Sequence, residues 1–240
     1  MALGIKMSTP NFMVYGELGR VPLSITIYKR MIAFWRKTPD DTLVLKLNSI
    51  IKNILSYETE QLGNHSKWLN HIKHILDVCG LSYMFNNIAN IKIEMIVENI
   101  LHDQYLQEWK QNIEHSSKGS FYKLFKNTLK FEPYLLLQPN IVRPLLKFRT
   151  LNHKLPIETG RWENTPRENR TCKHCTSPAV ADEQHYLFNC ESIHQYRTQY
   201  LAKYISWSKP VSINRILNLH KTSDLKNVSR YLNHMFSLFK

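Results

Sequence analysis

The sequence lacks any apolar run of ~18 residues, the length that a membrane-spanning helix requires. Its first residues, "MALGIKMSTPNF", lack the long apolar segment of a secretory signal. Glycine is scarce, with 7 residues in 240, and 43% of the residues are hydrophobic, which excludes a low-complexity or disordered chain. We therefore expect a globular protein that lies inside the cell, nuclear or cytoplasmic, and has no membrane partner.

Acidic residues are also few, since 19 Asp and Glu stand against 32 Lys and Arg, for a formal net charge of +13. Residues 1–140 carry 16 basic against 12 acidic residues, a balance of +4. Residues 141–240 carry 16 against 7, a balance of +9. An excess of this size favours a polyanionic partner, so we expect RNA or DNA and no small-molecule substrate.

Alternating strand patterns are almost absent, and helical patterns cover most of the chain. Helices are predicted at about 22–37, 40–54, 66–80 and 91–114, the third starting at Ser66 and stopping at Gly80.

From residue 121 the pattern changes to short helical or irregular segments, which Pro133 and Pro139 interrupt. The segment "LPIETGRW" predicts a turn-rich link, and residues 191–206 and 210–236 again predict helices. The sequence thus predicts a mainly α protein, with a division near 116–140.

Three of the four cysteines lie in the nineteen residues "CKHCTSPAVADEQHYLFNC". Their spacing is Cys172-x2-Cys175-x9-His185-x4-Cys190. Two residues between a pair of cysteines let a tight turn present both thiolates to one ion. Three thiols cannot all pair as disulfides, and the expected reducing compartment disfavours disulfides. We therefore predict one structural Zn²⁺ held by these four residues.

The fourth ligand is open at the level of sequence. On a regular helix His185 and Cys190 would point about 140° apart, so we expect a bend between them, with Cys190 near the start of the next helix. His194, four residues after Cys190, is the alternative ligand, and His174 is awkwardly placed inside the cysteine pair. Four protein ligands leave no position for water, so the predicted site is structural and not catalytic.

The residues around this element resemble a known family. The stretches "FRTLNHKLPIETGRW", "PRENRTCKHC" and "ADEQHYLFNC" resemble the zinc-binding motif, and the segment leading into it, that follow the reverse transcriptase domain of non-LTR (LINE-like) retrotransposons. "NFMVYGELGRVPLS" resembles the segment shortly after the polymerase region of the same proteins. The similarity covers residues 11–37 and 140–205, and residues 40–130 match only as a helical filler of suitable length.

The resemblance implies a C-terminal fragment of such a polyprotein, with an upstream reverse transcriptase domain as a further partner. The family's polymerase signature, an aromatic residue followed by x-Asp-Asp on a hairpin, is missing, because Asp40 and Asp41 follow "TP" and begin a predicted helix. The segments "PD" and "EWK" match a metal-dependent nuclease pattern only loosely, and both lie in predicted helices rather than strands. We expect no catalytic activity from this chain.

Two hypotheses of different classes follow. In the first, residues 131–240 form a zinc-stabilised, basic, nucleic-acid-binding region after a helical region at 1–130. Its predicted contacts are six cations and one stacking ring: Arg149, Lys154, Arg161, Arg167, Arg170, Lys173 and Trp162. Arg143, Lys147 and Arg197 are further candidate contacts. In the second hypothesis, the chain is a helical protein-interaction module and the zinc only staples its fold.

Overall fold

The computed structural model describes residues 4–37, 67–85, 92–205 and 212–239. Within these ranges the protein is mainly α, as the sequence predicts. The β pairing among these residues is limited to one antiparallel bridge between Thr171 and Val180. None of the described helices is long and apolar enough to cross a membrane.

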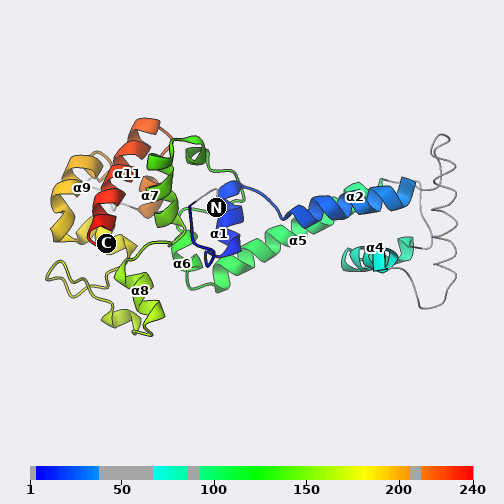
Figure 1. The fold of residues 1–240 in the computed structure, drawn as a ribbon, viewed down its shortest axis with the longest axis horizontal. Helices are drawn as coiled ribbons and strands as arrows, with labels where there is room; N and C mark the ends of the chain where they lie inside the picture. Colours follow the sequence, from blue (N-terminus) through cyan, green and yellow to red (C-terminus); the bar gives the residue numbers. More distant parts are fainter. Residues whose placement is uncertain (1–3, 38–66, 86–91, 206–211, 240) are drawn as a thin grey trace. The chain divides into compact units, whose positions relative to one another are not determined.

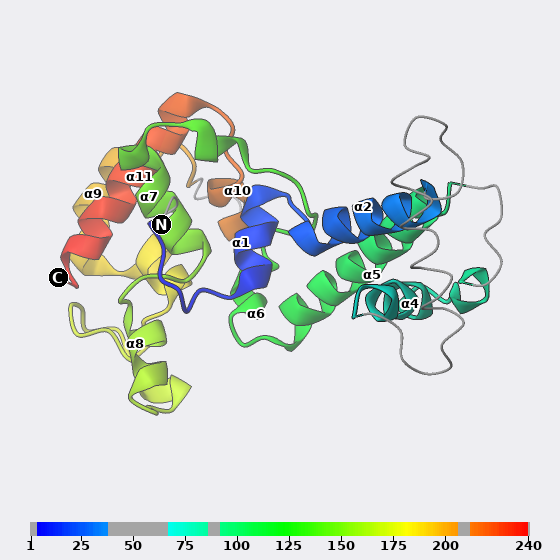
Figure 2. The same cartoon turned by 45° about the vertical axis from the view of Figure 1, so that its right-hand side comes forward.

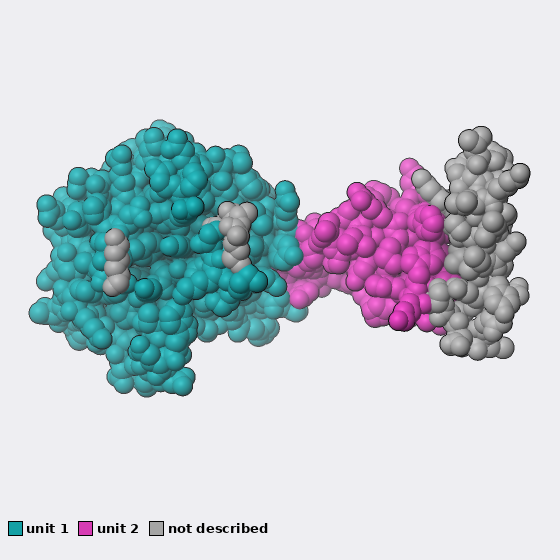
Figure 3. All heavy atoms as spheres, viewed as in Figure 1, with its two compact units in different colours: residues 1–20, 110–240 teal, residues 21–109 magenta. Residues whose placement is uncertain are grey.

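The chain forms two compact units, coloured separately in Figure 3. Unit 1 combines residues 1–20 with residues 110–240, and unit 2 comprises residues 21–109. The predicted division at 130 therefore differs from the division that the contacts give. The first twenty residues belong with the C-terminal part of the chain.

Unit 2 is built from helices that pack on a shared apolar core. Its elements are α2 (Leu23–Lys37), α4 (Lys67–Val78), the short η1 (Ser82–Met84) and the first part of α5 (Ile93–His115). Figures 1 and 2 both show α2 running alongside α5. Ion pairs Lys29–Glu98 and Arg36–Glu94 connect these two helices, at 2.6 and 3.0 Å.

Apolar residues of α2 and α4 contribute to the core of unit 2. Ile32 and Trp35 of α2 meet Ile72 and Leu76 of α4 in one buried cluster. After α4 the chain turns at Gly80, whose φ of +70° lies in the left-handed region, which confirms the predicted helix stop. The predicted helix at 40–54 and the predicted start at Ser66 lie outside the described residues.

Unit 1 holds the remaining elements. They are α1 (Asn11–Leu18), α6 (Gly119–Tyr122), η2 (Pro133–Leu136), α7 (Pro139–Arg149), α8 (Pro156–Trp162), η3 (Arg167–Asn169), η4 (His185–Asn189), η5 (Glu191–Ile193), α9 (His194–Leu201), α10 (Ile213–Leu217) and α11 (Thr222–Ser237). Helix α11 packs against both α7 and α9. Its buried side includes Leu225, Val228, Leu232 and Met235, the i, i+3, i+4 pattern of an amphipathic helix.

Helix α1 joins unit 1 through a buried ionic group. The Glu17 carboxylate is fully buried and accepts hydrogen bonds from Tyr134 at 2.7 Å, Tyr122 at 3.0 Å and Arg149 Nε at 2.9 Å. Gly19 follows, with φ +58°, where a Cβ would lie 2.0 Å from the backbone nitrogen of Phe131. A buried carboxylate needs such partners, which explains why α1 packs with residues distant in sequence.

Two local predictions need correction. The segment "LPIETGRW" is not a turn-rich link, because Pro156–Trp162 form helix α8 with Pro156 in the first turn, where its missing N–H costs nothing. Residues 210–236 are not one helix either, since α10 ends at Leu217 and α11 begins at Thr222.

Candidate metal centre and basic groove

The cysteine element is shaped by a turn that the sequence pattern does not reveal. Residues His185–Asn189 form a π-helical turn, and Cys190 leaves it with extended backbone, φ −61° and ψ 122°. The Cys190 N–H donates to the His185 carbonyl at 2.8 Å, an i→i+5 bond. This wider turn brings residues five apart to the same side, which confirms the predicted bend and places Cys190 just before η5 and α9.

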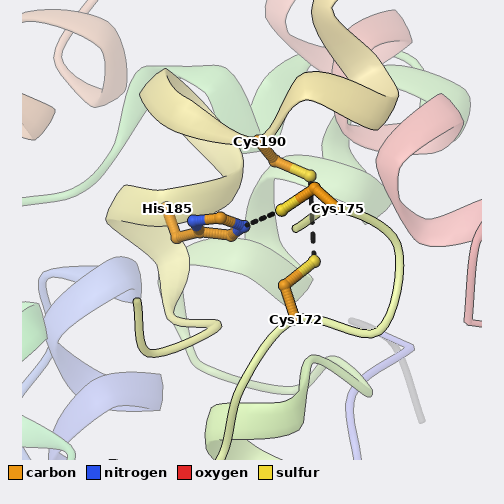
Figure 4. A group of neighbouring side chains, drawn as sticks. All are labelled: Cys172, Cys175, His185 and Cys190. Carbon is orange, nitrogen blue, oxygen red and sulfur yellow. Dashed lines mark hydrogen bonds between the residues drawn. The ribbon is translucent and has the colours of Figure 1, made fainter. Parts of the chain in front are cut away.

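Four side chains converge at this turn (Figure 4). Their ligand atoms, the Sγ of Cys172, Cys175 and Cys190 and a ring nitrogen of His185, all lie within 4.8 Å of one another. The Cys172 and Cys190 sulfurs are 3.9 Å apart, and Cys175 Sγ lies 3.5 Å from His185 Nε2. All three cysteines are free thiols. The four predicted residues thus form a cluster that can hold a metal ion.

The alternative histidines do not belong to this cluster. His194 is exposed on α9, where its Nε2 lies 3.4 Å from the Thr198 hydroxyl. The His174 ring packs edge-on against Phe239, at 5.1 Å between ring centroids. The geometry therefore selects His185 as the fourth residue.

Hydrogen bonds to the sulfurs alter the protonation of the cysteines. Burial by itself raises the pKa of the Cys172 thiol, but donors from the Tyr186 hydroxyl at 3.2 Å and the His174 N–H at 3.4 Å outweigh it and lower the pKa. Burial raises the pKa of Cys190 despite the Ser192 hydroxyl 3.0 Å away. Cys172 is therefore better prepared than Cys190 to be a thiolate ligand.

His185 is held in the form that binds metals. Burial lowers the pKa of its ring, only partly opposed by Asp182, so the neutral imidazole is favoured. Asp182 also accepts the backbone N–H of His185 at 2.9 Å. The Nδ1 on the far side of the ring is buried without a hydrogen-bond partner among the described residues. The Nε2 atom faces the three sulfurs and is free to ligate.

Residues outside the cysteine pattern fix the π-helical turn. Buried Arg197 donates from Nε to the Leu187 carbonyl at 3.0 Å and also reaches the Cys190 carbonyl. The Tyr231 hydroxyl of α11 donates to the carbonyl of Tyr186. Arg197 was a candidate nucleic-acid contact, and this prediction is wrong, because its guanidinium is buried and occupied by these carbonyls.

The predicted nucleic-acid contact at Arg149 is wrong, because this residue is buried. Its side chain is fully buried, bound to Glu17, 3.2 Å from Glu132, and 2.7 Å from the Leu217 carbonyl. On α7 it shares the buried side with Leu145 and Leu146. No phosphate can reach it.

Three of the other predicted cations are bound to groups of the protein itself. Arg170 donates to the Thr165 and Ile157 carbonyls, both at 2.9 Å. Arg161 pairs with buried Glu158 at 3.0 Å, and Arg167 pairs with Asp182 at 3.3 Å. These three arginines therefore already have protein partners.

The remaining candidates are open to solvent. Lys154 and Lys173 are exposed and have no ion pair among the described residues. Trp162 is 60% exposed, with Lys6 Nζ 4.5 Å from the centre of its ring. These side chains are free to meet a ligand.

A groove of about 830 Å³ in unit 1 lies beside these residues. Four cations line it, namely Lys6, Arg143, Lys147 and Lys154, and the described part of its lining contains no Asp or Glu. Ile5, Pro144, Phe236 and Phe239 supply apolar surface. Phe239 also packs edge-on against Tyr186, whose hydroxyl contacts Cys172.

Helical phase distinguishes the groove cations from buried Arg149. Arg143 and Lys147 are four residues apart on the exposed side of α7, opposite the face that buries Leu145 and Arg149. A count of basic residues includes Arg143, Lys147 and Arg149 alike, whereas the polar face of the amphipathic helix separates the first two from the third.

Comparisons with protein-family models, with curated proteins and with solved structures find no match for this chain.

Proposed function

We propose that this chain is a nucleic-acid-binding module whose unit 1 is stapled by one structural zinc ion. The observation that carries the proposal is the groove with four cations and no acidic residue in its described lining. Lys and Arg neutralise phosphates and release counterions, which is the main source of affinity for nucleic acids. Arg149 is not part of the proposed surface because it is buried, whereas Lys154 lines the groove.

The dimensions of the cysteine cluster support zinc as the metal. Zinc lies ~2.3 Å from sulfur and ~2.05 Å from imidazole nitrogen, so a tetrahedron separates two sulfurs by about 3.8 Å and a sulfur from a nitrogen by about 3.6 Å. The Cys172 and Cys190 sulfurs are 3.9 Å apart and Cys175 Sγ lies 3.5 Å from His185 Nε2, while all four ligand atoms lie within 4.8 Å of one another. A Cys₃His ligand set is also one of the common structural zinc sites.

The proposed role is binding rather than catalysis. Four protein ligands fill a tetrahedral zinc site and leave no position for a reacting water. Asp40 and Asp41, weighed above as polymerase residues, lie outside the described residues. The resemblance to the region after the reverse transcriptase of non-LTR retrotransposons supports the same role, with an upstream polymerase as partner.

A protein-interaction module is the second candidate, and one feature favours it. Helix α2 exposes Leu23, Ile27 and Phe34, which are 70%, 46% and 52% accessible as residues. Exposed apolar side chains of this kind are found at protein contacts. Removing this apolar surface would affect a protein partner, whereas nucleic-acid binding depends on the charges of unit 1.

The proposal is tested with the full chain, because a cut at residue 140 would divide unit 1. Elemental analysis should find one zinc per chain. Labelled RNA and DNA oligonucleotides should bind with an affinity that falls about a thousandfold between ~50 and ~200 mM salt if about six phosphates are neutralised. Absence of binding to both at ~50 mM salt would reject the proposal in favour of the second candidate.

A further inference from the structure

The groove of unit 1 runs along two packed helices. Helix α7 contributes Asn140, Arg143, Pro144 and Lys147, and α11 contributes Asn233, Phe236 and Ser237. Each set recurs at intervals of three and four residues, the spacing of one helix face. A hydrogen bond at 3.1 Å from Ser229 of α11 to the Asn140 carbonyl ties the two helices together. The groove walls are therefore parts of regular helices.

The lining combines three kinds of chemistry. Phe236 and Pro144 offer apolar surface, and the Phe236 ring stacks with His153 at 6.1 Å. Asn140 and Asn233 are exposed, and their side-chain amides make no hydrogen bond with the described residues. An amide offers a donor and an acceptor side by side, as the edge of a nucleobase does.

We propose that this groove binds unpaired nucleotides, with bases against Phe236, base edges on Asn140 and Asn233, and phosphates on Arg143 and Lys147. The inference rests on the proposed function and deepens it, because phosphate contacts alone would not distinguish single strands from duplexes. A groove of about 830 Å³ falls within the ~300–1,000 Å³ range of sites that take small planar groups.

A paired duplex fits this lining poorly. Its bases are stacked on one another, so no base face is free to lie against Phe236, and their Watson–Crick edges are already paired, which leaves only the backbone and the groove edges of the bases. An acidic peptide would satisfy the four cations but has no planar face to place on Phe236. The groove chemistry therefore favours single-stranded RNA or DNA, and the other two ligands become arms of the test.

The experiment measures fluorescence anisotropy of the zinc-loaded full chain with labelled 12-nucleotide rU, rA, rC and dT strands and with a 12-base-pair duplex. Poly-L-glutamate is an unlabelled competitor. Arg143→Gln/Lys147→Gln removes two groove charges. Lys226→Gln/Arg230→Gln is the matched control, since it removes two exposed charges with the same spacing on α11, outside the groove lining.

Single strands should bind at least about tenfold more tightly than the duplex, because stacking adds to the charge term. The groove double variant should lower the slope of log affinity against log salt by about 1.4 for single strands, from ~0.7 per contact, and by more than the control does. Asn140→Ala/Asn233→Ala should leave the slope unchanged and bring the affinities for rU, rA and rC within about twofold of one another.

Equal affinity for duplex and single strands, with no effect of the asparagine variant on base preference, would overturn the inference while leaving the proposed function intact. Equal losses in the groove and control variants would overturn it as well. Competition by poly-L-glutamate at charge concentrations equal to those of the oligonucleotides would identify an acidic-protein site instead. If the parent protein binds none of the oligonucleotides, the proposed function itself is rejected.

Discussion

The backbone carbonyl of His185 accepts a hydrogen bond from the N–H of Cys190 at 2.8 Å, and this one bond aligns two metal-binding side chains. An ordinary α-helical bond would have joined residues four apart and left the fifth pointing elsewhere. The π-helical turn is therefore the local structure that makes the spacing His-x4-Cys compatible with one ion.

Cys172→Ser should abolish stoichiometric metal binding, because it leaves three ligands for an ion that structural sites hold with four. Inductively coupled plasma analysis should find one zinc in the parent protein and much less in the variant. Cys79→Ser is the control, since Cys79 belongs to the core of unit 2. Full zinc content in Cys172→Ser would contradict the assignment.

Tyr186→Phe should weaken metal binding by about 10- to 100-fold, the usual effect of losing a hydrogen bond to a ligand. The variant removes the hydroxyl 3.2 Å from Cys172 Sγ and keeps the ring that packs against Phe239. Competition with a chromophoric chelator measures the change. An unchanged zinc affinity would show that this hydroxyl does not tune the thiolate.

Arg149→Met should cost about 3–5 kcal/mol of unfolding free energy, because it leaves the buried Glu17 carboxylate without its cation. The matched control is Lys123→Met, which breaks the exposed Lys123–Glu114 pair and should cost less than about 1 kcal/mol. Urea titrations followed by circular dichroism compare the two. Similar losses in both variants would refute a stabilising role for the buried pair.

The stability of unit 1 should fall at alkaline pH. Burial, and then the charge of Glu17, raise the pKa values of Tyr122 and Tyr134 well above the ordinary value near 10. Both phenols are neutral in either state below pH ~10. Above pH ~10 the phenols ionise in the unfolded chain but stay protonated in the folded protein. The free energy of unfolding therefore falls as the pH rises towards the pKa values that these phenols have in the folded protein.

Absorbance at 295 nm and urea titrations between pH 8 and 11.5 test this alkaline effect. Tyr122→Phe should make the decline of unfolding free energy above pH ~10 less steep without abolishing it, because it removes one phenol of raised pKa and leaves Tyr134, Tyr186, Tyr204 and Tyr231. If the free energy of unfolding of the parent protein is constant over this pH range, the predicted alkaline effect is wrong.

The sequence predicts the metal cluster well because the ligands are close along the chain. Nineteen residues contain all four, and a Cys-x2-Cys turn brings two together by itself. The π-helical turn could not be predicted, since Arg197 and Tyr231, which hold its carbonyls, come from other helices.

Helix positions were predicted from periodicity, but the partners of charged residues were not. Arg149 and Lys147 look alike in a charge count, although one is buried and the other exposed. Glu17, the partner of Arg149, lies 132 residues away, and no local pattern connects them. This contact lies within unit 1, which combines residues 1–20 with residues 110–240, so the observed division differs from the predicted boundary.

The separation of Glu17 from Arg149 also sets an order for folding during synthesis. At ~5–20 residues per second, a ribosome takes roughly 7–26 s to add the 132 positions between them. All of unit 2, residues 21–109, is made in that interval and can fold first. Helix α1 must meanwhile remain solvated or meet a chaperone, since its carboxylate has no cation to accompany it into a core.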